Sequence, residues 1–269
     1  MKKKASGRPS SVNQELLYGV NPLLEALRAG ERVPSEIVVA EGAQDERLRE
    51  LIELARVRNV TVKRAPRTSL DRAVGNTHHQ GVMARVGAAR YVDADDLLSS
   101  IGARVGSESE PLVVVLDGVE DPRNLGAILR TAECAGVDGV FVPERRAAGL
   151  TDAVAKASAG AIEHVPVSRV TNLSRLIEEL KERKVWVVGA VGDATMNYTD
   201  WDWTRPSAVV LGGEGAGLHR LVRENCDVLV RIPLRGKVQS LNVSVAAGII
   251  LYEVLRQRAL AVDSMTAPV

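Results

Sequence analysis

The chain has 269 residues, of which 45% are hydrophobic, 26% are charged and only 3% are aromatic, and its formal net charge is +1. These values are typical of a soluble globular protein with an aliphatic core. They exclude a strongly basic or strongly acidic protein that binds its partner through its net charge. No stretch reaches the roughly 20 apolar residues that a membrane-spanning helix needs, and no apolar signal segment follows the basic start, so we expect a cytoplasmic protein.

Residues 1–13 are expected to form a basic, disordered tail that carries four positive charges and no acid. A solvated tail is the simpler interpretation, and an arm that touches nucleic-acid phosphates is the alternative. No metal site or disulfide framework is indicated, because the two cysteines, Cys134 and Cys226, lie far apart and outside any CxxC pair.

Residues 14–90 are predicted to form a small α/β domain. Apolar spacing predicts a helix over 14–29, which Gly30 would end, and a second helix over 47–58. Short strands are expected at 37–40, 60–62 and 82–86. Residues 91–110 are predicted to be a linker, because 102–110 ("GARVGSESE") is rich in Gly, Ser and Glu.

Residues 111–262 are predicted to form a larger α/β domain. Valine-rich runs without polar alternation are typical of a parallel sheet covered on both faces. We expect strands at 112–116, 140–142, 185–188, 209–211 and 228–232, and helices at 125–135, 173–183 and 241–258.

The segment "DGVEDPRNLGAILRTAECAG" follows the first of these strands. Asn124 is placed to cap the next helix, which is its simplest role. Arg130 lies six residues further on, between apolar neighbours, and a surface arginine is the simpler interpretation.

The segment "VVLGGEGAGL" places four glycines within six positions after a strand, so that backbone can approach a ligand closely. It matches neither a Walker A loop nor GxGxxG, which argues against a nucleotide phosphate. Glu214 lies among these glycines, and an exposed loop carboxylate is its simplest interpretation.

The segment "RIPLRGKVQSLNVSVAAGII" joins a strand to an apolar helix. Ser240 or Asn242 could cap that helix. The polar residues Ser240, Asn242 and Ser244 at alternate positions also suggest the polar floor of a pocket.

These three segments, in this order, resemble the motifs of the TrmH-type ribose 2′-O-methyltransferases of the SPOUT superfamily. The first half, with "YGVNPLLEALRAG" and "HHQGVMARV", is similar to the L30e-like substrate-binding domain of the bacterial enzymes that methylate a guanosine ribose in the peptidyl-transferase loop of 23S ribosomal RNA. The resemblance implies a SPOUT domain with a parallel sheet and a deep trefoil knot, preceded by the L30e-like domain, although knots are otherwise almost absent from proteins.

The resemblance also implies S-adenosylmethionine as the cofactor and large-subunit ribosomal RNA as the partner. The implied cofactor-binding residues are Leu211, Gly212, Gly213, Gly217, Ile232, Leu234 and Leu241. The implied catalytic residues are Asn124, Arg130, Glu214, Ser240 and Asn242. A homodimer through the knotted region would let Arg130 serve the other subunit. The last helix, with Ile249, Ile250 and Leu251, would be the dimer face, and the core of a single chain is the alternative for these side chains.

The basic segment 55–67, with five cations and no acid, fits phosphate binding, and a solvated helix end is the alternative. The turn at His78 and His79 could contact an unstacked RNA base. The alternatives are a sister enzyme that acts on another ribosomal site or on transfer RNA, and a catalytically silent assembly factor. A nicotinamide-dependent dehydrogenase is disfavoured, because the glycine loop does not match.

Overall fold

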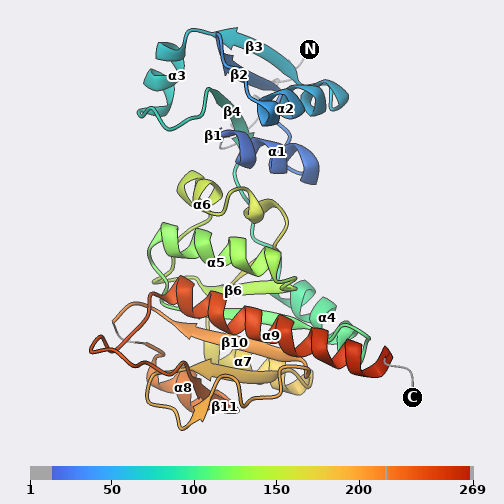
Figure 1. Ribbon diagram of the computed structural model, residues 1–269, viewed down its shortest axis with the longest axis vertical. Helices are drawn as coiled ribbons and strands as arrows, with labels where there is room; N and C mark the ends of the chain where they lie inside the picture. The colour runs from blue at the N-terminus through green and yellow to red at the C-terminus, as the bar shows by residue number, and fades with distance from the viewer. Residues whose placement is uncertain (1–13, 216, 267–269) are drawn as a thin grey trace, which may run out of the picture. The chain divides into compact units, whose positions relative to one another are not determined.

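A computed structural model describes residues 14–215 and 217–266, and the predicted basic tail lies outside this part of the chain. Two compact units divide between Ala88 and Ala89 (Figure 1). None of the helices in the described part is long and apolar enough to cross a membrane.

The first unit is a four-stranded sheet with three helices, in the strand order β1-β4-β2-β3. The elements are β1 (Gln14–Tyr18), α1 (Val20–Ala29), β2 (Glu36–Ala40), α2 (Glu46–Val57), β3 (Thr61–Ala65), α3 (Arg67–Val74) and β4 (Val82–Gly87). The prediction of one helix over 14–29 is therefore wrong in its first five residues. These residues pair with β4 as an antiparallel strand, and Gly19, with a φ of 97°, turns the chain into α1.

His79 does not contact solvent, so the prediction that it touches RNA is wrong. Its ring is fully buried, hydrogen-bonds Asp71 at 2.9 Å and accepts the backbone N–H of Gly81 at 3.0 Å. It holds the turn before β4. His78 and the cations of the basic segment are exposed, although Lys63 pairs with Glu36.

The second unit contains a seven-stranded, fully parallel sheet in the order β7-β6-β5-β10-β8-β11-β9. Its strands are β5 (Leu112–Asp117), β6 (Gly139–Pro143), β7 (Val167–Val170), β8 (Trp186–Ala190), β9 (Met196–Asn197), β10 (Ser207–Gly212) and β11 (Val228–Arg231). Its helices are α4 (Ala94–Arg104), α5 (Pro122–Cys134), α6 (Asp152–Ala157), the 3₁₀ turn η1 (Ala161–Glu163), α7 (Leu173–Glu182), α8 (Arg220–Asn225) and α9 (Val243–Thr266). The predicted parallel α/β class is confirmed, and the knot stays a prediction.

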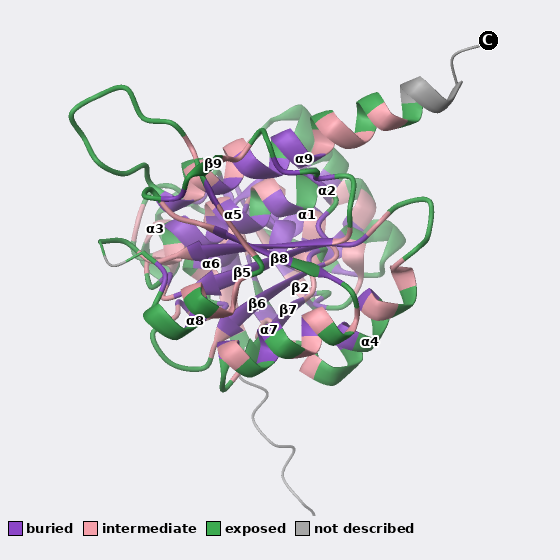
Figure 2. Ribbon diagram, turned by 90° about the horizontal axis from the view of Figure 1, so that it is seen from below, coloured by how far each residue is buried: buried purple, intermediate pink, exposed green. Residues whose placement is uncertain are grey.

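Helices cover both faces of this sheet, which explains its uninterrupted valine runs. Figure 2 shows α5 and α9 on one side and α4, α7 and α8 on the other, with the strands buried between them. Every residue of β5 is buried. The predicted dimer face on α9 is wrong for Ile250 and Leu251, because both are fully buried in the core of a single chain. The exposed apolar side chains of α9 include Val245 and Tyr252.

The predicted linker over 91–110 differs from the structure, because most of it is a helix of the second unit. Asp93 caps α4 by accepting the backbone N–H groups of Asp95 and Asp96. Leu97, Leu98 and Ile101 then enter the same apolar core as β5 and α7. Only 105–110 remain a loop before β5.

We expect Ile101→Ala to lower the free energy of unfolding of the second unit by about 2–5 kcal/mol, because it leaves a cavity beneath the sheet. Urea denaturation measures this change. Ser100→Ala, on the exposed side of α4, is the matched control and should change stability by less than about 0.5 kcal/mol. Equal, small effects of the two substitutions would mean that α4 does not belong to this core.

Candidate functional site

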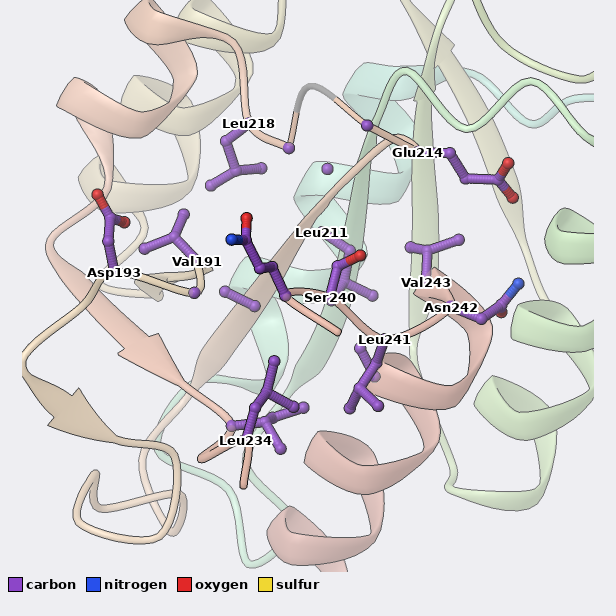
Figure 3. Close-up of a pocket in the computed structure, with 18 of the residues that line it drawn as sticks. Val191, Asp193, Leu211, Glu214, Leu218, Leu234, Ser240, Leu241, Asn242 and Val243 are labelled. Carbon is purple, nitrogen blue, oxygen red and sulfur yellow. The ribbon is translucent and has the colours of Figure 1, made fainter. Parts of the chain in front are cut away.

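A cavity of about 600 Å³ opens at the carboxyl edge of β8, β10 and β11, where open α/β sheets bind ligands. Its size lies within the range of small-molecule sites. Six of the seven residues predicted to bind a cofactor line it: Leu211, Gly212, Gly217, Ile232, Leu234 and Leu241 (Figure 3). Gly213 is not among the lining residues and packs against Gly118 instead.

The glycine loop after β10 is packed so tightly that side chains are excluded at two positions. A Cβ on Gly212 would lie 2.1 Å from the carbonyl carbon of Gly217, and a Cβ on Gly213 would lie 2.0 Å from the carbonyl oxygen of Gly118. Gly215 and Gly217 have positive φ values, which favour glycine. Gly212 and Gly213 therefore allow close packing, and Gly215 and Gly217 allow the left-handed backbone of the loop. Backbone atoms of this loop form one wall of the cavity.

Asp117, the last residue of β5, holds the glycine loop in place by hydrogen bonds. It was not among the predicted site residues. The residue is 4% exposed, and its carboxylate accepts the backbone N–H of His219 at 2.7 Å and contacts the Nδ1 atom of that ring at 2.8 Å. Its backbone oxygen accepts the N–H of Gly213 at 2.7 Å. A carboxylate that ends a buried valine strand was the available signal.

We expect Asp117→Asn to lower the free energy of unfolding by about 1–3 kcal/mol. The asparagine amide puts an NH₂ donor where one of the two carboxylate oxygens was. That donor would face the backbone N–H or the ring of His219, so one hydrogen bond is lost. Chemical denaturation measures the loss. His219→Ala removes only a half-exposed ring and should cost less than about 1 kcal/mol. If His219→Ala lowered the free energy of unfolding as much as Asp117→Asn does, the contact of Asp117 with the His219 ring would be what holds the loop.

A chain of hydrogen bonds joins three segments that are far apart in the sequence. Asn124 donates from Nδ2 to Glu214, and Asn242 donates from Nδ2 to the Oδ1 atom of Asn124 at 3.1 Å. Asn242 also accepts from the backbone N–H of Ser244 at 2.9 Å, so it does cap α9. The structure thus brings Asn124, Glu214 and Asn242 together, while Ser240 lines the cavity beside them.

Asn124 does not cap its own helix, contrary to the simple interpretation. Asp121 is the cap and accepts the backbone N–H of Arg123 at 2.8 Å, and Pro122 takes the first helical position, which suits its fixed φ. Asn124 therefore lies in the first turn, only 7% exposed, with its amide free to bind the other two segments.

Arg130 is not brought into this cluster within one chain. It is exposed on α5, six residues after Asn124, which corresponds to about 9 Å along a helix axis, and it does not line the cavity.

Asp193 lies on the side of the cavity away from Glu214 and Asn242 (Figure 3) and belongs to a second polar pair. Arg223 donates to Asp193 at 3.0 Å, and this hydrogen bond holds the pKa of the exposed Asp193 carboxyl below its ordinary value. Both residues line the cavity, and nothing in the sequence marked them.

The parallel sheet with a ligand-sized cavity at its carboxyl edge defines an α/β protein that binds a small molecule. Residues 111–252 match the SpoU rRNA methylase family, and residues 16–92 match the RNA 2′-O ribose methyltransferase substrate-binding domain. The chain belongs to the SpoU family of RNA methyltransferases.

Relatives of known name support this assignment over almost the full chain. YacO of Bacillus subtilis (strain 168), whose name places it in the TrmH family of tRNA/rRNA methyltransferases, is 44% identical over 92% of this chain and 98% of its own. The 23S rRNA (guanosine-2′-O-)-methyltransferase RlmB of Pseudomonas syringae pv. tomato is 46% identical over 91% of this chain and 96% of its own. The SpoU methyltransferase AviRb of Streptomyces viridochromogenes, crystallised with AdoMet, has a TM-score of 0.74 at 26% identity and covers 94% of this chain and 95% of its own.

Proposed function

We propose that the protein transfers the methyl group of S-adenosylmethionine to the ribose 2′-hydroxyl of a guanosine in the peptidyl-transferase loop of 23S ribosomal RNA. The observation that carries the proposal is the hydrogen-bonded group Asn124–Glu214–Asn242 at the mouth of the cavity. The 46% identity to RlmB, whose name states 2′-O-methylation of a guanosine in 23S ribosomal RNA, supports the choice of guanosine. With ribosomal RNA as the substrate, the cytoplasm is the expected compartment.

The chemistry of the cavity fits this cofactor. Leucine and isoleucine side chains offer an apolar slot for a purine ring, and the glycine loop offers backbone groups at close approach. No Walker or GxGxxG sequence is present, in keeping with a ligand that lacks phosphates. Leu211, Gly212, Ile232 and Leu241 would hold the adenosine, and Gly217 and Leu234 would close the slot; Gly213 would act through its packing against Gly118.

When bound, S-adenosylmethionine supplies a methyl group on a positively charged sulfur. The 2′-oxygen would take that methyl group, the electrons of the broken carbon–sulfur bond would stay on the sulfur, and the hydroxyl proton would pass to solvent water. Glu214 and Ser240 would orient the ribose, while Asn124 and Asn242 hold Glu214 in place. Such positioning can account for much of the rate acceleration.

Arg130 would stabilise negative charge that develops on the 2′-oxygen, because a guanidinium is effectively never deprotonated in proteins. Its exposed position on α5 suits a role in the cavity of a second copy. Exposed Val245 and Tyr252 on α9 give this side of the unit apolar surface for such a homodimer. Gly248 of α9 approaches Thr131 of α5, which puts the two helices in contact.

The experiment is transfer of tritium from labelled S-adenosylmethionine to large-subunit RNA from cells that lack this protein, followed by mapping of the labelled nucleotide. Label on a 2′-O-methylguanosine in the peptidyl-transferase loop is expected. Label at another ribosomal site or on transfer RNA would keep the chemistry and change the substrate. A folded protein that binds the cofactor but labels no RNA would be an assembly factor.

A further inference from the structure

The loop that follows β6 begins beside the cavity. Gly212 pairs with Asp117 across β10 and β5, and Val115 pairs with Phe141 across β5 and β6, so Pro143 at the end of β6 is level with Gly212. Neighbouring strands are about 4.8 Å apart, which places the ends of β6 and β10 about 10 Å from one another. The loop of residues 144–150 therefore begins about 10 Å from the β10 wall of the cavity.

This loop is held in a fixed and unusual conformation. Ala148 donates its backbone N–H to Val119 at 2.9 Å, and Leu150 donates to the hydroxyl of Tyr91 at 3.0 Å. Between these anchors and β6, Arg146 has a φ of 57°, in the left-handed region that costs a side-chain-bearing residue free energy. Strain of this kind concentrates at functional positions.

Arg145 and Arg146 are both exposed, and neither makes a hydrogen bond or ion pair with any residue in the described part of the chain. Two other exposed arginines of the second unit, by contrast, are paired within their own helices: Arg175 with Glu179 and Arg220 with Glu224. Two neighbouring guanidinium groups without partners, on an anchored loop, are suited to a ligand outside the chain.

The first turn of α5, which follows the loop after β5, adds a third cation. Arg123 is 88% exposed, and its side chain only contacts Asp121 at 3.3 Å, whose carboxylate also accepts the helix N–H. Glu120 and Glu144 are the remaining exposed acids of the two loops. The Ala148–Val119 hydrogen bond joins the loop after β6 to the loop that leads into α5, so the three arginines lie on adjoining segments.

We propose that Arg145 and Arg146, together with Arg123, bind phosphate groups of the RNA strand next to the nucleotide in the cavity. A guanidinium donates two parallel hydrogen bonds to a phosphate, and such contacts position a nucleic acid without reading its sequence. The separation of about 10 Å from the end of β10 fits phosphates within a few nucleotides of the target. This inference rests on the proposed function, because it takes RNA as the substrate.

The test compares RNA binding by the wild type, Arg145→Ala/Arg146→Ala and the charge-matched control Arg175→Ala/Arg220→Ala. The dissociation constant for an unmodified 23S ribosomal RNA transcript is measured between roughly 50 and 200 mM salt. We expect the first variant to bind at least about tenfold more weakly, with a salt dependence that is shallower by about 0.7 for each lost contact. The control should keep the wild-type salt dependence, and cofactor binding should be unchanged in all three proteins.

Arg146→Gly removes one guanidinium while relieving the left-handed backbone, so weaker RNA binding by this variant would not arise from misfolding. An Arg145→Lys/Arg146→Lys variant keeps the charges and should keep most of the salt dependence. Suppose that the wild-type enzyme methylates the transcript and that Arg145→Ala/Arg146→Ala binds it with an unchanged salt dependence. This result would overturn the present inference and leave the proposed function standing. An equal loss of RNA affinity in Arg175→Ala/Arg220→Ala would also overturn this inference. A wild-type protein that neither binds nor methylates the transcript would overturn both this inference and the proposed function.

Discussion

Gly212→Ala is expected to weaken binding of S-adenosylmethionine by at least about 100-fold. The new methyl group would lie 2.1 Å from the carbonyl carbon of Gly217 and 2.5 Å from the backbone nitrogen of Leu218. Carbon atoms in contact need about 3.5–4.0 Å, so the two walls of the cavity must separate by more than 1 Å. A misplacement of that size is enough to cost about two orders of magnitude at a site that depends on position.

The backbone of Gly212 itself is not in the left-handed region, so the effect would come from the clash and not from the φ angle. Isothermal titration calorimetry measures the affinity, and thermal unfolding checks that the variant folds; overpacking of this kind costs about 1–3 kcal/mol of stability. Gly236→Ala is the control, because no atom lies within 4 Å of its added methyl group. Unchanged affinity in a folded Gly212→Ala protein would mean that this wall of the cavity does not hold the cofactor.

The sheet of the second unit could be predicted because burial on both faces leaves a plain signal. The runs at 112–116 and 209–211 carry no polar residue, and both are central strands. Short elements gave no comparable pattern: α6 and α8 have six residues each, and β7 includes an exposed arginine. In the first unit, tertiary pairing with β4 decided the state of 14–18, where the leucines suited a helix equally well.

Helix α4 was predictable in principle. Asp93 followed by Leu97, Leu98 and Ile101 is a cap and an apolar face, but the glycine- and serine-rich stretch beside it suggested a linker instead. The contacts of the site were not predictable from local patterns. Asn124 meets Glu214 and Asn242 across 90 and 118 positions, and only the resemblance to a family grouped them beforehand.

Asn124→Asp is expected to reduce methyl transfer to ribosomal RNA by at least about 100-fold at neutral pH while leaving the fold intact. The change is nearly isosteric, but it replaces the amide that donates to Glu214 by a second carboxylate. Two carboxylates at hydrogen-bond distance cannot both stay charged in place, so Glu214 must move or one group must take up a proton. The amide that Asn242 donates would still find an acceptor oxygen, so the fault would be confined to the Glu214 side.

The sign of the pH dependence separates this explanation from general damage. As the pH falls, one carboxyl group of the pair becomes protonated and can donate to the other, so the activity of Asn124→Asp relative to the wild type should rise. Single-turnover methylation at saturating cofactor, measured across the pH range in which both proteins are folded, gives this ratio. Asn172→Asp is the matched control: Asn172 caps α7 away from the cavity, and aspartate caps a helix equally well, so activity should not change. A ratio that stays flat or falls as the pH decreases would show that Asn124 does not act by holding Glu214.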